Sequence, residues 1–446
     1  MKLITDWASA RALLARPAPY LDLQASPRLA EGIRRVFGEP LSPEQAVARI
    51  LADVRRDGDR ALLDYTHRLD GVSLDALQVP PQSLQEAWQG LAPDLREALG
   101  MASRRIRAFH ERCLREGWID RGLGLGQALR PLERVGLYVP GGSARYPSTV
   151  LMSAIPARVA GVREVILATP PGRDGRVPQS TLAAASLAGV DRVYAMGGAQ
   201  AIAALAYGTE SVPRVDKVCG PGNIFVTLAK KMVFGTVDID GLFGPTETLI
   251  VADDSADPAL CARDLLAQAE HDPLASPILI TTSLEVARTV SRQVEEQLVN
   301  MERREIAAAA VEGQGAVVVV DSLERAFELA NSYAPEHLAL LVRDPWAHLD
   351  KVRHAGAVFL GEASGEALGD YIAGPSHVLP TGGTARFSSP LGVETFLRRM
   401  SVIGLDEATS RALAKPGAVI ARAEGLGGHA AALEAREQPR EGRQNI

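Results

Sequence analysis

From about residue 132 onward, short apolar segments alternate with longer stretches whose apolar residues recur at helical spacing. One series contains "LERVGLYV", "EVILAT", "DRVYAM" and "DKVC", and a second contains "ETLIVAD", "PILITT", "GAVVVVD", "HLALLV" and "AGAVFLG". Strands that alternate with helices indicate parallel βαβ units, because two parallel neighbours need a crossover connection. The sequence therefore predicts an α/β protein with two tandem Rossmann-like, doubly wound parallel sheets.

The segments on either side of these two series are predicted to be helical extensions. In "SPEQAVARILADV", Ser42 is suited to the N-cap, Pro43 to the first helical position and Gln45 to the capping box. We expect four parts: an N-terminal helical segment at 1–30, a first α/β domain at 31–134 plus 246–390, a second α/β domain at 135–245, and a C-terminal helical segment at 391–446.

Composition excludes several classes of protein. The chain has 446 residues, of which 46% are hydrophobic and 23% charged, as in globular proteins of several domains. The net charge is -6 without a strongly basic block, so a nucleic-acid partner is not expected. The longest aliphatic run, "GAVVVV", is too short to cross a membrane. Three widely separated cysteines, Cys113, Cys219 and Cys261, are typical of reduced thiols, and we expect a cytoplasmic location.

Two Glu-His pairs are conspicuous in a chain with only 8 histidines. The first lies in "QAEHDP", where Gln268 and His271 would share a helix face and could offer two ligands to one metal ion. Glutamine is an unusual zinc ligand, and no H-E-x-x-H motif is present. A capped helix end with a solvent-facing histidine is the structural alternative.

The second pair lies in "YAPEHLAL". Pro335 ends the preceding helix, so Glu336 and His337 stand at the beginning of a predicted strand. A carboxylate beside an imidazole can divide proton transfer between the two groups. The structural alternative is that neighbouring strand residues point to opposite faces, which would leave one buried and one exposed.

Two further segments carry polar candidates. "GDYIAGPSH" has Asp370 and His377 in a long Gly/Pro/Ser-rich stretch, which predicts a functional loop or, more simply, an Asx-type turn with a surface histidine. "AEGLGGHAA" has Glu424 and His429, which would lie about 140° apart on a continuous helix. Their spacing therefore does not make them partners.

Glycines follow three of the predicted strands, in "GLYVPGGSARYPS", "MGGAQA" and "CGPGNIF". Backbone N–H groups at such turns and at helix starts are suited to binding phosphate. None of the three is a G-x-G-x-x-G motif, so the glycines by themselves leave nucleotide binding open.

Taken together, the ordered motifs resemble the histidinol dehydrogenase family from about residue 30 to residue 436. The segments that carry the resemblance are "GLYVPGGSA", "MGGAQAIAALAYGT", "VDKVCGPGN", "GPTETLIVAD", "AQAEHDP", "YAPEHL", "GDYIAGPSHVLPTGGTARFSSPL" and "AEGLGGHA". The resemblance implies oxidation of L-histidinol to L-histidine through L-histidinal, in the last steps of histidine biosynthesis, with two hydride transfers to NAD.

The resemblance also assigns residues to roles. It implies one zinc ion per subunit held by Gln268, His271, Asp370 and His429. It implies that His337, as a neutral imidazole, takes the alcohol proton, and that Glu336 activates the water that adds to the aldehyde. The substrate would contact the metal ligands, His337 and three further residues, Thr246, His377 and Glu424. NAD would contact Tyr138, Gln200 and Asn223. The resemblance thus implies that the domain at 135–245 binds NAD and that the domain at 31–134 plus 246–390 carries the metal and catalytic residues.

Family members are homodimers in which the C-terminal segment reaches the partner's site, and the same is expected here. The chain departs from the family at Thr246, where "GPTE" replaces the usual "GPSE". That departure keeps open a related metal-dependent NAD dehydrogenase acting on another small polar alcohol. Two other classes are a metal-dependent hydrolase, which NAD dependence would exclude, and a non-catalytic binding protein, whose function would survive a change at Glu336.

Overall fold

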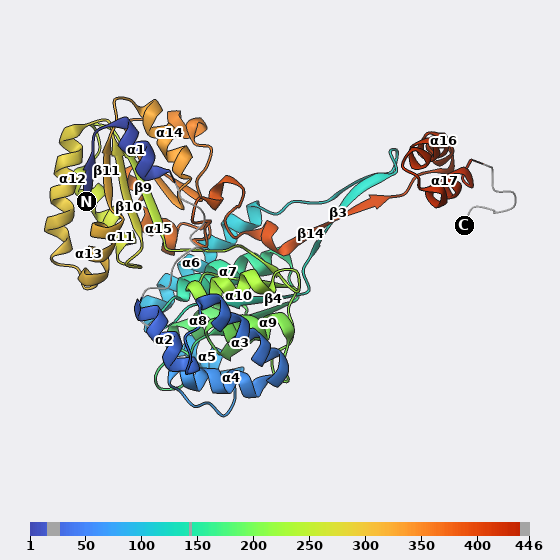
Figure 1. Ribbon diagram of the computed structural model, residues 1–446, viewed down its shortest axis with the longest axis horizontal. Helices are drawn as coiled ribbons and strands as arrows, with labels where there is room; N and C mark the ends of the chain where they lie inside the picture. Colours follow the sequence, from blue (N-terminus) through green and yellow to red (C-terminus); the bar gives the residue numbers. More distant parts are fainter. Residues whose placement is uncertain (16–26, 142–144, 438–446) are drawn as a thin grey trace. The chain divides into compact units, whose positions relative to one another are not determined.

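The computed structural model of the chain describes residues 1–15, 27–141 and 145–437 (Figure 1). It contains two compact units. Unit 1 comprises Met1–Leu114 and Leu132–Phe396, and unit 2 comprises Arg115–Pro131 and Leu397–Ile446. Within the described ranges, no helix is both long enough and apolar enough to cross a membrane.

Unit 1 contains a six-stranded sheet in which every pair of neighbouring strands is parallel. In spatial order its strands are β1 (Lys2–Ile4), β11 (Ala316–Val319), β10 (Ser276–Thr281), β9 (Glu247–Ala252), β12 (His337–Leu341) and β13 (Ala357–Leu360). The chain builds outward from β9 in one direction and then returns to add β12 on the other side. This reversal confirms the predicted doubly wound arrangement, and β1 is an additional strand that the sequence pattern did not reveal.

Helices cover both faces of this sheet (Figure 1). One face carries α11 (Pro258–Ala269), α12 (Leu284–Leu298) and α13 (Arg304–Gly313), and the other carries α1 (Trp7–Leu14) and α14 (Leu323–Tyr333). The strands are buried on both sides, which is why they read as continuous apolar runs. The connection from β12 to β13 contains only the 3-10 helix η3 (Trp346–Lys351).

Unit 1 also contains a five-stranded parallel sheet. In spatial order its strands are β6 (Arg192–Ala195), β5 (Glu164–Thr169), β4 (Arg134–Tyr138), β7 (Lys217–Cys219) and β8 (Asp238–Ile239). Its helices are α3 (Pro43–Asp57), α4 (Asp59–Tyr65), α5 (Gln82–Gln89), α6 (Pro93–Arg112), α7 (Pro147–Ala160), α8 (Gln179–Ala188), α9 (Gly198–Tyr207) and α10 (Ile224–Val233). The order reverses between β4 and β7, which is where ligands bind in open α/β sheets.

Helices α3 and α4 show how the N-terminal part packs. The capping box is confirmed, since Ser42 and Gln45 each accept a hydrogen bond from the other's backbone N–H. The apolar stripe of α3, which includes Ile50, shares one core with Ile202 of α9 and Val226 of α10. We expected residues 31–134 to join the sheet formed by 246–390. The apolar stripe of α3 packs instead against the helices and strands of the five-stranded sheet. The other domain limits stay predictions.

Unit 2 begins with an antiparallel sheet of β2 (Trp118–Asp120), β3 (Leu125–Pro131) and β14 (Leu397–Ile403). It ends with α16 (Glu407–Ala423) and α17 (Gly427–Glu434). The segment at 391–446, which we expected to be helical, therefore contains a strand as well. The partner of β14 lies far away in the sequence, so local helical spacing could not indicate the pairing.

Candidate active site

The amino ends of β9 and β12 bring two pairs of polar residues together. β9 begins at Glu247, directly after Thr246, and β12 begins at His337, directly after Glu336. The two strands are neighbours, with His337 level with Thr248. Most ligand sites of open parallel sheets lie at the carboxyl ends of the strands. This cluster lies at the opposite edge of its sheet.

The backbone before the second pair is unusual. Ala334 has a φ of 54° and is the one non-glycine residue with a positive φ in the part of the chain that the structure describes. It forms the C-cap of α14, and Pro335 then prevents the helix from continuing. A left-handed alanine costs free energy, and such strain is concentrated at functional sites. Here it turns the chain sharply into β12.

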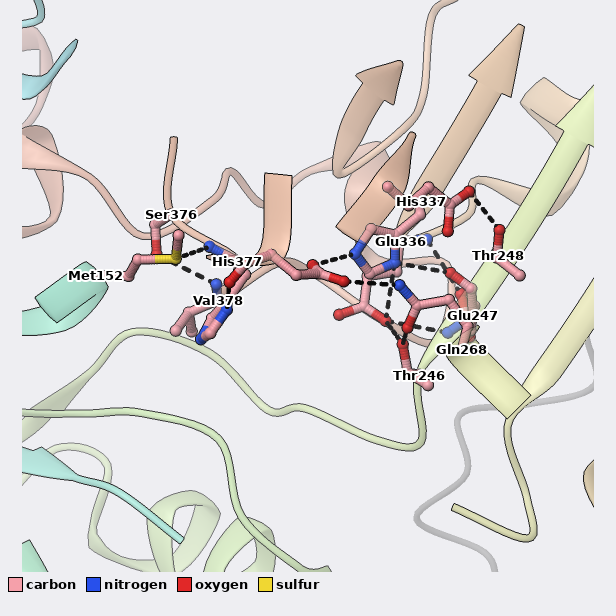
Figure 2. Close-up of polar contacts among 12 residues, drawn as sticks. Met152, Thr246, Glu247, Thr248, Gln268, Glu336, His337, Ser376, His377 and Val378 are labelled. Atoms are coloured by element: carbon pink, nitrogen blue, oxygen red, sulfur yellow. Dashed lines mark hydrogen bonds and ion pairs between the residues drawn. The ribbon is translucent and has the colours of Figure 1, made fainter. Parts of the chain in front are cut away.

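Glu336 is buried, and donors from the beginning of β9 hold its carboxylate (Figure 2). Its Oε2 atom accepts hydrogen bonds from the Thr246 hydroxyl at 2.7 Å and from the Glu247 backbone N–H at 3.0 Å. His337 is buried too, so the alternation that would expose one member of the pair does not apply. Burial raises the pKa of Glu336 to about 7, which is favourable for a group that exchanges protons near neutral pH.

His337 is oriented from both ring nitrogens. Its Nδ1 lies 3.1 Å from the Glu247 backbone oxygen, and its Nε2 lies 3.3 Å from Asp370 Oδ1. Both oxygens can only accept, so this geometry favours a ring that donates from both nitrogens. Burial by itself lowers the pKa of His337, but the nearby carboxylates of Glu336 and Asp370 outweigh burial and raise the pKa to about 10. The neutral ring that we expected is therefore disfavoured while both carboxylates keep their charge.

Asp370 connects this pair to Gln268. It lies in α15 (Glu366–Tyr371), a short helix where we expected an irregular loop. Its Oδ2 accepts a hydrogen bond from Gln268 Nε2 at 2.9 Å, while its Oδ1 faces His337. Burial opposes ionisation, but the hydrogen bond and positive charge of His337 prevail and lower the pKa of Asp370 to about 2. Asp370 is therefore a carboxylate at neutral pH.

Two further histidines flank Asp370. His271 follows α11 and keeps part of its surface exposed, yet desolvation by the surrounding protein lowers its pKa. His377 donates from Nδ1 to the Asp370 backbone carbonyl at 2.6 Å. Burial lowers the pKa of His377, and in its neutral ring Nε2 accepts from the Thr149 hydroxyl at 2.9 Å. Both rings are thus favoured in the neutral form that can bind a metal ion or a donor.

Glu424 and His429 belong to unit 2, where both are exposed. Glu424 is the C-cap of α16, and His429 lies in α17. Gly425, with a φ of 77°, separates the two helices. The predicted angle of about 140° assumed one continuous helix, so it does not apply. The two residues do not share a helix face.

Three of the four expected metal ligands thus lie close to one another in unit 1. Gln268 offers an amide oxygen, His271 an imidazole and Asp370 a carboxylate. Among the residues with a described placement, no group of three or more His, Cys, Asp and Glu side chains has an arrangement that could hold a metal ion. That result is compatible with the expected set, because one ligand is a glutamine and another, His429, lies in unit 2.

Tyr138, Gln200 and Asn223 all line one cavity of about 950 Å³ in unit 1. Tyr138 ends β4, and the other two residues follow β6 and β7, so the cavity lies at the carboxyl ends of these strands. The Tyr138 hydroxyl accepts a hydrogen bond from the Gly198 N–H at the start of α9. Asn223 caps α10. The amino ends of two ten-residue helices therefore border the cavity, and helix amino ends are suited to binding phosphate.

Sequence reasoning missed Glu247 and Thr149. Glu247 is buried, accepts a hydrogen bond from the Gly382 N–H and supports both members of the Glu336-His337 pair through its backbone. A carboxylate at the head of the continuous apolar strand "ETLIVA" was the available signal, because such residues are rarely buried without a partner. Thr149 lies in an ordinary helical segment and offered no signal.

Comparison with known proteins agrees with this geometry. The family model described as histidinol dehydrogenase matches residues 39–437. The chain belongs to the histidinol dehydrogenase family. A histidinol dehydrogenase of Dehalococcoides mccartyi (strain CBDB1) is 52% identical over 97% of this chain and 99% of the relative, and one of Moorella thermoacetica is 55% identical over 91% and 97%.

A crystal structure of histidinol dehydrogenase from Elizabethkingia anophelis is similar in fold, with a TM-score of 0.89, 33% sequence identity and coverage of 98% of each chain. The resemblance drawn from the motifs is thus confirmed, as is the mixed α/β fold with parallel sheets. As a member of the histidinol dehydrogenase family, the chain is an oxidoreductase.

Proposed function

We propose that this chain catalyses the zinc-dependent, NAD-linked oxidation of L-histidinol to L-histidine through L-histidinal. The observation that carries the proposal is the contact network of Glu336, His337, Asp370 and Gln268, in which a proton-transfer pair adjoins two metal-ligand types. Family membership supports both the substrate and the place of the reaction in histidine biosynthesis.

The residues present suit a zinc ion. Gln268, His271, Asp370 and His429 would hold it, and two oxygens with two nitrogens are compatible with a metal that also binds substrate. When bound, zinc would orient the imidazole and amino nitrogens of the substrate and neutralise the Asp370 charge that favours protonated His337. The other substrate contacts in this proposal are Thr246, His377 and Glu424.

His337 is the proposed base of the first oxidation. Its ring is held by Glu247 and Asp370, so the position of its Nε2 is defined before substrate binds. Once the Asp370 charge is neutralised and the ring is neutral, the alcohol proton passes to Nε2 while a hydride leaves the carbinol carbon for NAD. A fixed donor–acceptor geometry accounts for much of the rate gain in such transfers.

Glu336 is the proposed base of the second oxidation. It takes a proton from the water that adds to the aldehyde, and the resulting hydrate then loses the second hydride to NAD. A carboxylate with a pKa raised to about 7 is a stronger base than an ordinary glutamate. The buried surroundings of Glu336 also limit access of bulk water, so the reactive aldehyde is retained between the steps.

The cavity at the carboxyl ends of β4, β6 and β7 supports an NAD site formed by Tyr138, Gln200 and Asn223. Gln200 is fully buried, and neither atom of its amide has a hydrogen-bond partner among the described residues. Buried amides are normally paired, so these two atoms are suited to a ligand. The bordering helix amino ends favour the pyrophosphate of a dinucleotide.

We further propose a cytoplasmic homodimer in which Glu424 and His429 of one subunit complete the site of the other. Unit 2 exposes several large apolar side chains, as expected for a surface that a partner covers: Trp118, Ile119, Ile403, Val419 and Ile420. The absence of nucleic-acid and membrane partners stays a prediction from composition.

The test is NADH production from L-histidinol by the purified protein, before chelation, after chelation and after restoration of zinc. We expect about two NADH per histidinol, lost on chelation and regained with zinc. A well-folded, zinc-loaded protein that forms no NADH from histidinol would contradict the proposal. A panel of small polar alcohols would then test the alternative substrate class that Thr246 keeps open.

A further inference from the structure

Asp70 lines the same cavity from the side of the N-terminal helices. It is the last residue of the π-helix η2 (Thr66–Asp70), and the cavity wall here also includes residues of α2 (Pro27–Phe37). The Asp70 Oδ2 atom is buried and has no hydrogen-bond partner within the described ranges. A buried carboxylate oxygen without a donor is costly, so this atom needs an explanation.

The cavity contains a second observation of the same kind. Gln200 is fully buried beside the Tyr138 end of β4, and both of its amide atoms lack partners among the described residues. An unpaired acceptor at Asp70 and an unpaired amide at Gln200 therefore line one cavity. A ligand with both hydroxyl donors and polar acceptors would satisfy the two groups together.

The charges near Asp70 do not already neutralise it. Burial raises the pKa of Asp70 to about 6, so it remains a carboxylate at neutral pH. The cavity lining includes two cations, Arg68 and Arg35. Arg68 is paired with Asp64 at 3.0 Å and packs over the Tyr65 ring. Arg35 is exposed.

The position of the cavity indicates which part of a dinucleotide it holds. The nicotinamide ring must reach the carbon from which hydride leaves, next to His337. None of Thr246, Gln268, Glu336 and His337 lines the cavity, whereas Asp70 and Tyr138 do. The enclosed part of the ligand is therefore the adenosine half.

We propose that Asp70 accepts a hydrogen bond from the 2′-hydroxyl of the adenosine ribose and thereby selects NAD against its 2′-phosphorylated form. The inference rests on the proposed NAD-linked function and adds a specificity-determining residue to it. A carboxylate favours a hydroxyl donor and repels a 2′-phosphate, which is the discrimination that an acidic residue provides in other dinucleotide sites.

The experiment measures dissociation constants by calorimetry for NADH, NADPH and the 2′-deoxyadenosine analogue of NADH. The variants are Asp70→Asn and, as a matched control, Asp75→Asn, which changes an exposed aspartate outside the cavity. We expect Asp70→Asn to weaken NADH binding about tenfold, since a hydrogen bond to a charged group is lost. We also expect the preference for NADH over NADPH to be smaller in Asp70→Asn than in the wild type. Asp75→Asn should keep the wild-type dissociation constants.

The wild-type protein provides a test that does not depend on the variant's folding. The wild type should bind the 2′-deoxy analogue about tenfold more weakly than it binds NADH. The Asp70→Asn variant should bind the analogue and NADH with equal affinity. Equal binding of NADH and the analogue by the wild type would overturn the role of Asp70. Equal affinities of the wild type for NADH and NADPH would also overturn the role of Asp70. A wild type that neither binds NADH nor reduces NAD would instead refute the proposed function itself.

Discussion

His337 Nε2 and Asp370 Oδ1 lie 3.3 Å apart, while the other carboxylate oxygen of Asp370 accepts from Gln268. One aspartate thus fixes the ring of the proposed base and also stands among the proposed metal ligands. Positioning of the base and binding of the metal ion are therefore coupled through a single side chain. A change at Asp370 would disturb both, so the two oxidations are better separated by changes at Glu336.

Glu336→Gln should impair the second oxidation more severely than the first. The amide can still accept from Thr246 and the Glu247 N–H, so the fold is preserved, but it cannot take a proton from water. Loss of a general base costs about 10²- to 10⁴-fold. Rapid-mixing rates with histidinol and with histidinal measure the two steps separately. Glu312→Gln, on the exposed side of α13, is the control. Equal losses in both steps would show that the role of Glu336 is wrongly assigned.

The same residue predicts a pH dependence. The carboxylate form of Glu336 is the reactive one, and burial raises its pKa from 4.5 to about 7. The rate of histidinal oxidation should therefore rise as pH increases through about 7. The Thr246 hydrogen bond favours the charged form and opposes this shift. Thr246→Val should consequently move the rise to higher pH, whereas Thr246→Ser should leave it in place; unchanged profiles in both variants would exclude this coupling.

His110 should make the protein sensitive to acid. It is 1% exposed, neither ring nitrogen has a partner among the described residues, and burial lowers its pKa from 6.5 to about 4. As pH falls below 6.5, His110 is protonated in the unfolded chain while it is still neutral in the folded protein. The free energy of unfolding is therefore unaffected by His110 above pH 6.5 and decreases as pH falls towards 4. The loss approaches about 3 kcal/mol.

Replacement of His110 by phenylalanine removes the titrating group while keeping a ring against Phe109. Urea unfolding at several pH values between 7.5 and 4.5 should show a smaller loss of stability in His110→Phe than in the wild type. His67→Phe, at an exposed position, is the control and should keep the wild-type loss. The same pH slope in all three proteins would rule out the contribution of His110.

The turn after β7 depends on a glycine. Gly220 has a φ of 116°, and an added Cβ would lie 2.0 Å from the Tyr138 backbone oxygen. Its N–H donates to Asp240, and its carbonyl accepts from Lys230. Gly220→Ala should therefore lower the free energy of unfolding by about 2 kcal/mol or more.

Because Asn223 belongs to the same turn, Gly220→Ala should also weaken NADH binding. Chemical denaturation and calorimetry measure the two effects. Gly313→Ala is the control, because nothing lies within 4 Å of its added Cβ, and it should retain wild-type stability and binding. A Gly220→Ala variant with the same free energy of unfolding as the wild type would contradict the strain argument.

Local patterns predicted much of the fold, but they could not reveal long-range pairing. The helix at Ser42 and the strand at Glu164 carry their own caps and apolar runs, so their sequences were sufficient. β1 and β14 have partners more than 200 residues away, and no local signal marks them. The stripe of α3 predicted a buried face without indicating which sheet it covers.

The candidate site shows the same limit. Motifs identified Glu336, His337, Gln268 and Asp370, because their residue types and order resemble a known family. Supporting partners such as Thr149 depend on which helix packs beside the site, which no motif encodes. The protonated state favoured for His337 could not be predicted either, because it arises from two carboxylates that only the fold brings together.

Subunit mixing tests whether sites are shared between subunits. Glu336→Gln removes the proposed base from unit 1, and His429→Asn removes a proposed metal ligand from unit 2. A homodimer of either variant should therefore be nearly inactive in the second oxidation. If unit 2 of one subunit completes the partner's site, a hybrid dimer carries both lesions in one site and none in the other. Random reassociation of equal amounts should then restore about a quarter of wild-type activity. Mixing without dissociation is the control, and no recovery after verified hybrid formation would mean that each subunit completes its own site.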